Sequence, residues 1–181
     1  MIELLSNTYI LLLNSFIFGL FTKTADLLNE HGLKMFKGAK TLYGVLWGIT
    51  GTFVIVGHPL LASFYLAILV NWVIKGNIDY FNHRLAAAFI FTVVLYRDLS
   101  LAIDWLLFGI TILLFTVLGL ILRKGWIKKT FFTNNNLHVF TVLIFMSLIS
   151  QEYWVVVISY LLNSIAYHAL KQWGIRNLPY Y

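Results

Sequence analysis

Long apolar runs separated by short charged segments are the feature that most restricts how this chain can fold. Hydrophobic residues make up 60% of the chain and charged residues only 11%, whereas soluble domains have about 45–50% and about 25%. A soluble domain of 181 residues cannot hide so much apolar surface. Because one membrane crossing takes about 20 apolar residues, we expect a single all-α domain over residues 1–181, a polytopic transmembrane helix bundle in the cell membrane.

Breaking the apolar runs at the charge clusters predicts about seven transmembrane spans. The spans lie near residues 3–22, 41–57, 59–74, 82–96, 99–122, 138–150 and 152–170. The fourth and sixth runs are short for about 30 Å of hydrocarbon, so five or six crossings are the alternative. Tryptophans near the ends of the runs are interpreted as anchors at the membrane interface, namely Trp47, Trp72, Trp105, Trp126 and Trp154.

Lysine and arginine give an independent test of these spans, because they concentrate in cytosolic loops. Twelve of the 13 basic residues fall in the first, third and fifth connections and in the C-terminal tail. These connections are the loops near 23–40, 75–82 and 123–137. We therefore expect the C-terminus in the cytosol and the N-terminus outside. This distribution also explains the net charge of +6, so no nucleic-acid partner is expected.

The first cytosolic loop has the pattern of a short amphipathic helix lying in the headgroup layer. Thr24 is placed to cap the start of this helix, and Gly32 is placed to end it in the left-handed conformation. Asp26 and Glu30 are four residues apart and would share one face. They either pair with nearby lysines on a solvated face or belong to a site.

The third connection also combines ionisable and amide side chains at the mouth of a span. Asp79 and His83 are four residues apart, so on a helix they share a face and could bind one metal ion or relay one proton. Arg84 lies beside them. Such groups are unfavourable near hydrocarbon unless they are paired or functional. The cluster is therefore either a hydrogen-bonded structural element or a site.

Together these loops place carboxylates and basic groups on one membrane face. Carboxylates bind Mg²⁺, and basic side chains bind phosphate. The combination indicates a metal-dependent transferase or hydrolase that acts on the phosphate headgroup of a membrane lipid. The catalytic candidates are Asp26, Asp79 and His83, the metal ligands Asp26, Glu30 and Asp79, and the substrate-binding candidates Lys37, Lys40, Thr41 and Arg84.

Two other classes of protein fit the same pattern. A small-molecule or ion transporter, or a membrane subunit of one, would bind its substrate near the midplane and would need an oligomer or a membrane complex to complete a pathway. Its candidate residues are Gly48, Gly51, Asn71, Asn163, Ser164 and Tyr167, although small residues in spans are more often helix contacts. Asp104, in the fifth span, is either a proton-coupling carboxylate or a paired residue near the interface. In a structural subunit of a membrane complex the charges would set topology alone.

One stretch of about 25 residues carries a family resemblance. Asp26 and Gly32 precede the string Lys37-Gly38-Ala39-Lys40-Thr41-Leu42-Tyr43-Gly44, which enters the second span. This stretch resembles the first cytosolic loop of CDP-archaeol synthase and related membrane cytidylyltransferases. The resemblance implies Mg²⁺-dependent transfer of a cytidylyl group from CTP to a lipid phosphate. It also implies that Lys40 and Thr41 contact phosphate and that Asp26 assists the metal.

Overall fold

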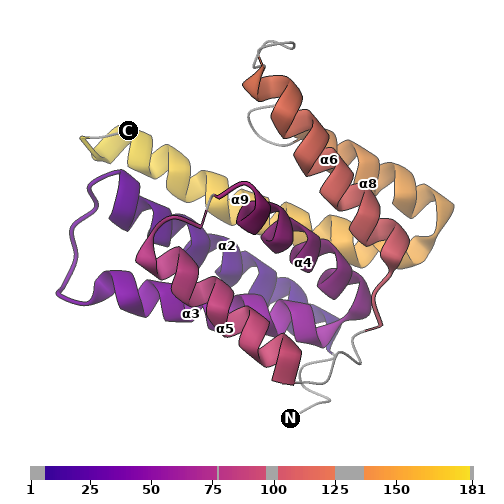
Figure 1. The fold of residues 1–181 in the computed structure, drawn as a ribbon, viewed down its shortest axis with the longest axis horizontal. Helices are drawn as coiled ribbons and strands as arrows, with labels where there is room; N and C mark the ends of the chain where they lie inside the picture. Colours follow the sequence, from indigo (N-terminus) through magenta and orange to yellow (C-terminus); the bar gives the residue numbers. More distant parts are fainter. Residues whose placement is uncertain (1–6, 77, 97–101, 125–136, 180–181) are drawn as a thin grey trace.

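The fold is known from a computed structural model that describes residues 7–76, 78–96, 102–124 and 137–179. Within these ranges it contains seven α-helices, one short 3₁₀ helix and no strand (Figure 1). The elements are α2 (Thr8–Glu30), α3 (Ala39–Gly57), α4 (Pro59–Ile74), α5 (Phe81–Tyr96), α6 (Trp105–Arg123), α8 (Leu137–Ile149), η1 (Gln151–Tyr153) and α9 (Trp154–Asn177). The prediction of an all-α fold is confirmed.

Three segments of the described chain are long and apolar enough to cross a membrane, which fits a membrane protein. They are α2, α3 and the continuous segment Gln151–Asn177. Four further helical segments of 10–17 residues are apolar: Pro59–Ile74, Phe81–Tyr96, Trp105–Val117 and Val139–Ile149. Most of the predicted loop near 123–137, with Trp126 and its predicted role at the interface, falls on residues 125–136, outside the described residues.

Helix α2 packs along both α3 and α9. Helix α3 also packs against α4 and α5, while α6 lies on α4 and α8 lies on α9 (Figure 1). A Cβ atom added to Gly19 of α2 would lie 2.3 Å from the backbone oxygen of Asn163 on α9. A Cβ atom on Gly48 of α3 would lie 3.2 Å from the Cα atom of Ala86 on α5. Small residues therefore set the close approach of these helices.

Helix α2 continues through the segment that was predicted to form a separate headgroup helix. The Thr24 hydroxyl donates to the carbonyl of Leu20, 2.8 Å away within the same helix, so Thr24 does not cap a new one. That prediction is wrong, because the apolar face of α2 stays buried through Leu27 and Leu28. Gly32 does end the helix with φ of 76°, as expected.

Asp104 lies just before α6 and not inside a span. Its Oδ1 accepts from the backbone N–H of Leu107 at 2.9 Å, which caps the helix. Its Oδ2 accepts from the Tyr153 hydroxyl at 2.7 Å, and its own N–H donates to the Ser63 hydroxyl at 2.8 Å. Of the two interpretations from sequence, the structure supports the paired residue, which fastens α4, α6 and η1 together.

The predicted tryptophan anchors separate into two groups. Trp105 and Trp154 are 73% and 41% exposed, as an interface anchor requires. Trp47 is only 3% exposed, and its ring packs edge-on against Trp72 at a centroid distance of 6.1 Å. The anchor interpretation is wrong for Trp47, because this side chain fills the space between helices.

His58 links protein stability to pH at the turn between α3 and α4. Its Nδ1 accepts from the backbone N–H of Leu60 at 3.2 Å, which requires a neutral ring. Burial lowers the pKa of His58 from its ordinary value of 6.5, and Glu152 acts in the opposite direction. Below about pH 6.5 the unfolded chain binds a proton that the folded chain resists, so stability falls as the pH decreases.

Thermal unfolding in detergent at about pH 8 and about pH 5 measures this effect. We expect His58→Asn to reduce the loss of stability at the lower pH, because asparagine keeps a capping oxygen and does not titrate. An equal loss in both proteins would contradict this role of His58.

Candidate functional site

A cavity of about 480 Å³ lies inside the bundle and is lined by α2, α3, α4, α5, α6 and α9. Helix α2 contributes Phe18, Thr22, Asp26 and Glu30, which are four residues apart and so follow one face of the helix. At 1.5 Å per residue this stripe is about 18 Å long. The cavity therefore has a charged end, which we call the Glu30 end, and an aromatic end, which we call the Phe18 end.

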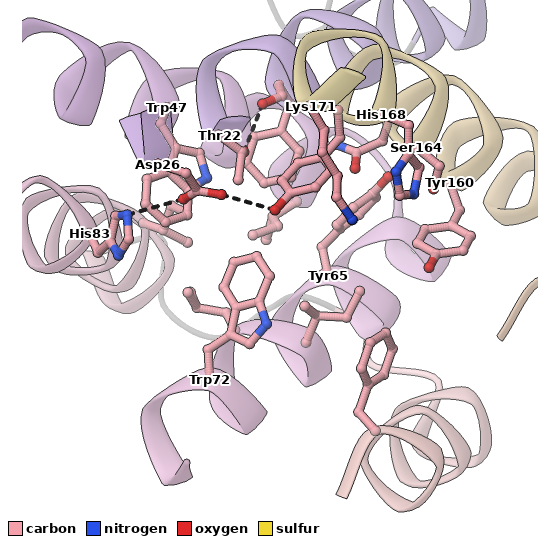
Figure 2. Close-up of a pocket in the computed structure, with 18 of the residues that line it drawn as sticks. Thr22, Asp26, Trp47, Tyr65, Trp72, His83, Tyr160, Ser164, His168 and Lys171 are labelled. Carbon is pink, nitrogen blue, oxygen red and sulfur yellow. Dashed lines mark hydrogen bonds and ion pairs between the residues drawn. The ribbon is translucent and has the colours of Figure 1, made fainter. Parts of the chain in front are cut away.

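Three side chains converge at the Glu30 end. Asp26, Glu30 and His83 each offer one ligand atom, and these atoms lie within 4.8 Å of one another. Asp26 Oδ1 lies 3.2 Å from His83 Nε2. Figure 2 shows the Asp26 carboxylate facing the His83 ring across the cavity wall. Two helices distant in sequence, α2 and α5, thus build one possible metal centre.

The Asp26 carboxylate is held in place through its second oxygen. Oδ2 accepts from the Tyr167 hydroxyl at 2.9 Å and lies 3.6 Å from Lys23 Nζ. Lys23 Nζ also lies 5.0 Å from the centre of the Tyr167 ring, in a cation–π contact. Because these groups occupy Oδ2, the other oxygen, Oδ1, is directed toward His83 and remains in position to bind a cation.

His83 is equally well fixed. Its side chain is 7% exposed, and its ring lies edge-on against Trp47 and Tyr80 at centroid distances of 5.2 and 5.4 Å. Nδ1 lies 3.7 Å from an Asp79 oxygen. A carboxylate beside one ring nitrogen is the usual support for a histidine whose other nitrogen binds a metal.

The other ring nitrogen, His83 Nε2, is buried and has no hydrogen-bond partner. It lies within ion-pair distance of Asp26, but the two groups are not aligned as a hydrogen bond. A buried polar atom without such a partner destabilises a protein by about 1–3 kcal/mol. A cation bound between His83 and the carboxylates would satisfy this nitrogen.

Asn82 holds the first turn of α5 against α2. Its Nδ2 donates to the backbone carbonyl of Ala25 at 3.2 Å, and its Oδ1 accepts from the Asn29 side chain. Helix α3 can approach this turn because a Cβ atom on Gly44 would lie 2.9 Å from Asn82. The position of His83 relative to Asp26 is therefore set by packing and by hydrogen bonds of neighbouring residues.

The structure places the predicted site residues in two groups. Asp26, Glu30, Asp79 and His83 all line the cavity, although the Asp79 side chain is 60% exposed. The remaining four are exposed and are not among the residues lining the cavity: Lys37, Lys40, Thr41 and Arg84. Arg84 donates to the backbone carbonyl of Asp79. Substrate contacts by these four residues stay predictions.

Helix α9 supplies cavity residues that the sequence analysis did not assign to this site. The Tyr167 hydroxyl contacts Asp26, and Figure 2 shows His168 and Lys171 projecting from α9 toward the cavity, with His168 beside Ser164. Asn163 and Ser164, which had been assigned to a transporter, line the same cavity. A polar stripe at spacings of three and four residues on an apolar last helix was the available signal.

Comparisons of the chain with protein-family models, with curated proteins and with solved structures gave no match.

Proposed function

We propose that this protein is a membrane enzyme that uses a divalent metal ion to act on the phosphate group of a lipid. The observation that supports this proposal is the convergence of Asp26, Glu30 and His83 at one end of a cavity that is also lined by apolar and aromatic side chains. Metal and phosphate belong at the charged end, and hydrocarbon belongs at the aromatic end. In the topology proposed from the basic residues, with seven spans and the N-terminus outside, the Glu30 end faces the cytosol.

The ligand set modifies the expectation of Mg²⁺. Carboxylate oxygens suit Mg²⁺ and Mn²⁺, whereas imidazole suits transition metals such as Zn²⁺ and is a poor ligand for Mg²⁺. Ligand atoms on opposite sides of Mg²⁺ are about 4.2 Å apart, since each bond is about 2.1 Å long. The separation of up to 4.8 Å in this cluster is slightly larger. Mn²⁺ is therefore the cation we propose first, with Glu30 completing the site by a small side-chain movement.

A phosphate group at this centre would lie in the cavity that Lys171 and His168 also line. Lys171 and His168 approach from α9, while a metal held by α2 and α5 would polarise a phosphoryl oxygen. This arrangement serves hydrolysis of a lipid phosphate or transfer to it. The resemblance of the first loop to membrane cytidylyltransferases favours transfer from CTP. Lys40 and Thr41, in the first turn of α3, would then contact the phosphates of CTP from outside the cavity.

Turnover by the purified protein in nanodiscs tests this proposal. Phosphatidate with Mn²⁺ is assayed for release of inorganic phosphate, and the same mixture with CTP is assayed for release of pyrophosphate. We expect one of the two products, its loss on addition of EDTA, and its recovery with excess Mn²⁺. No product with Mn²⁺, Mg²⁺ or Zn²⁺ would contradict the proposed enzyme.

Transport is a second candidate, because Asn163, Ser164 and Tyr167 line the cavity. Two of these residues already have protein partners, however. Asn163 donates to the backbone carbonyl of Ser15 at 3.3 Å, and Tyr167 donates to Asp26. Gly48 and Gly51, the other transporter candidates, are positions of close helix contact. Metal-dependent accumulation of a phosphate ester inside proteoliposomes, without chemical change, would favour transport over catalysis.

A further inference from the structure

We propose that the cavity holds the hydrocarbon tail of the phosphate ligand and that its Phe18 end limits the length of this tail. The inference rests on the proposed function and adds a substrate class, namely phosphate monoesters whose tail is short enough to enter. The phosphate lies at Asp26, Glu30 and His83, and the tail extends along α2 toward the middle of the bundle.

The walls beyond the metal cluster are mainly apolar or aromatic. Ile68, Leu69 and Trp72 of α4 face the cavity from one side, and Phe115 of α6 and Ile90 of α5 add to the same surface. Figure 2 shows Trp72 bordering the space close to Asp26, with Tyr65 farther along. Such a surface gains free energy when it contacts hydrocarbon and excludes water.

Three polar side chains between the metal cluster and the Phe18 end already have partners within the protein, whereas the Nε1 atom of Trp47, beside His83, has no hydrogen-bond partner. The Thr22 hydroxyl donates to the carbonyl of Phe18 at 2.8 Å, within its own helix. Asn163 donates to the carbonyl of Ser15, and the Tyr167 hydroxyl donates to Asp26. An alkyl chain lying beside Thr22, Asn163 and Tyr167 would leave all three donors with their hydrogen-bond partners. It would therefore not incur the free-energy cost of burying an unpaired donor.

The Phe18 end is closed by aromatic side chains that are held in place. Phe18 packs edge-on against Tyr65 at a centroid distance of 5.5 Å. The Tyr65 hydroxyl lies 3.0 Å from the Ser159 hydroxyl, which lies 2.7 Å from that of Ser15. Tyr160 packs against Phe64, which is fully buried. These contacts join α2, α4 and α9, so the aromatic side chains at the Phe18 end are fixed by the packing of three helices.

The geometry predicts a dependence on chain length that stops at a limit. Glu30 and Phe18 are about 18 Å apart along α2, which bounds the length of an extended tail. Each methylene buried before that limit is expected to raise affinity about fourfold. Beyond it, added carbons would have to bend or leave the cavity and would add nothing.

The test uses ethyl, butyl, octyl, dodecyl and hexadecyl phosphate with Mn²⁺, so that the series passes the limit, and it compares variants in the same detergent, so that partition into micelles cancels. A gain in affinity that continues undiminished from dodecyl to hexadecyl phosphate would contradict the limit. Thr22→Leu fills the cavity one helical turn below Asp26, whereas Thr22→Ala removes the same hydroxyl without adding bulk. Thr24→Leu makes the same change as the first variant, at a residue that does not line the cavity. We expect the affinity of the wild-type protein to rise from ethyl to octyl phosphate, and we expect no such rise in Thr22→Leu. The two controls, Thr22→Ala and Thr24→Leu, should keep at least about half of the wild-type rise in the logarithm of the affinity.

The affinity for inorganic phosphate separates this inference from the proposed function. If Mn²⁺ and inorganic phosphate bind but longer esters bind no better, the tail proposal is wrong and the metal centre stands. If neither Mn²⁺ nor inorganic phosphate binds, the proposed function itself is wrong. An undiminished gain in Thr22→Leu would also overturn the tail proposal.

A photoreactive ester covers the case in which Thr22→Leu does not fold. Octyl phosphate with a diazirine at the end of its chain is bound to the wild-type protein, irradiated and mapped by peptide mass spectrometry. We expect labels on peptides that contain Phe18, Ile55 or Tyr65. Labels confined to the exposed faces of α6 and α8 would contradict a tail inside the cavity.

Discussion

Asp26→Asn is expected to lower the affinity for Mn²⁺ by at least about 100-fold and to abolish turnover, because it removes a negative ligand from the centre of the cluster. The amide oxygen can still accept from Tyr167 at the position of Oδ2, so the helices should stay in place. Calorimetric titration of Mn²⁺ and the product assay measure the two effects, and thermal unfolding checks the fold.

Glu152→Gln is the matched control for Asp26→Asn. It makes the same chemical change at an exposed carboxylate in η1, which does not line the cavity. Mn²⁺ affinity of this control should stay within about threefold of wild type. If Asp26→Asn also retains Mn²⁺ affinity within that range, Asp26 is not a ligand and the site has been placed wrongly.

Gly19→Ala is expected to destabilise the bundle by at least about 1–3 kcal/mol. The new Cβ atom would lie 2.3 Å from the backbone oxygen of Asn163, and a backbone atom cannot rotate away as a side chain can. Helices α2 and α9 must therefore separate, which also lengthens the contact between Asp26 and Tyr167. A lower unfolding temperature and weaker Mn²⁺ binding should appear together in this variant.

Gly109→Ala provides the comparison for this packing effect. A Cβ atom at Gly109 of α6 would have nothing within 4 Å, so the substitution adds no clash. Alanine favours a helix over glycine by about 1 kcal/mol, and we expect stability at or above that of wild type. Similar unfolding temperatures for Gly19→Ala and Gly109→Ala would show that the approach of α2 to α9 is not tight.

The arrangement of apolar runs allowed the helices to be predicted closely. The run near 59–74 coincides with α4, and the run near 41–57 differs from α3 only at its start. Proline and glycine mark these ends, since Pro59 opens α4 and Gly38 precedes α3 with φ of 93°. The extension of α2 to Glu30 was missed because a charge cluster was interpreted as the end of a span, whereas Lys23 is buried beside Asp26 and Tyr167.

The candidate site could be predicted only in part, because sequence spacing shows neighbours within one helix and not between helices. Asp79 and His83 were paired correctly at the start of α5, where they lie 3.7 Å apart. The contact of His83 with Asp26 depends on how α2 and α5 both pack against α3. The spacing of residues within one helix does not predict such packing between helices. The same limit applies to Lys171, which lines the cavity because α9 packs on α2.

Electron spin-echo spectroscopy of bound Mn²⁺ tests most directly whether His83 and the carboxylates hold one cation. We expect a nitrogen modulation from a coordinated imidazole in the wild-type protein. The modulation should disappear in His83→Gln and remain in His168→Gln, which changes a histidine of the same cavity that is not part of the cluster. Absence of nitrogen coupling in the wild-type protein, or its persistence in His83→Gln, would contradict the metal centre.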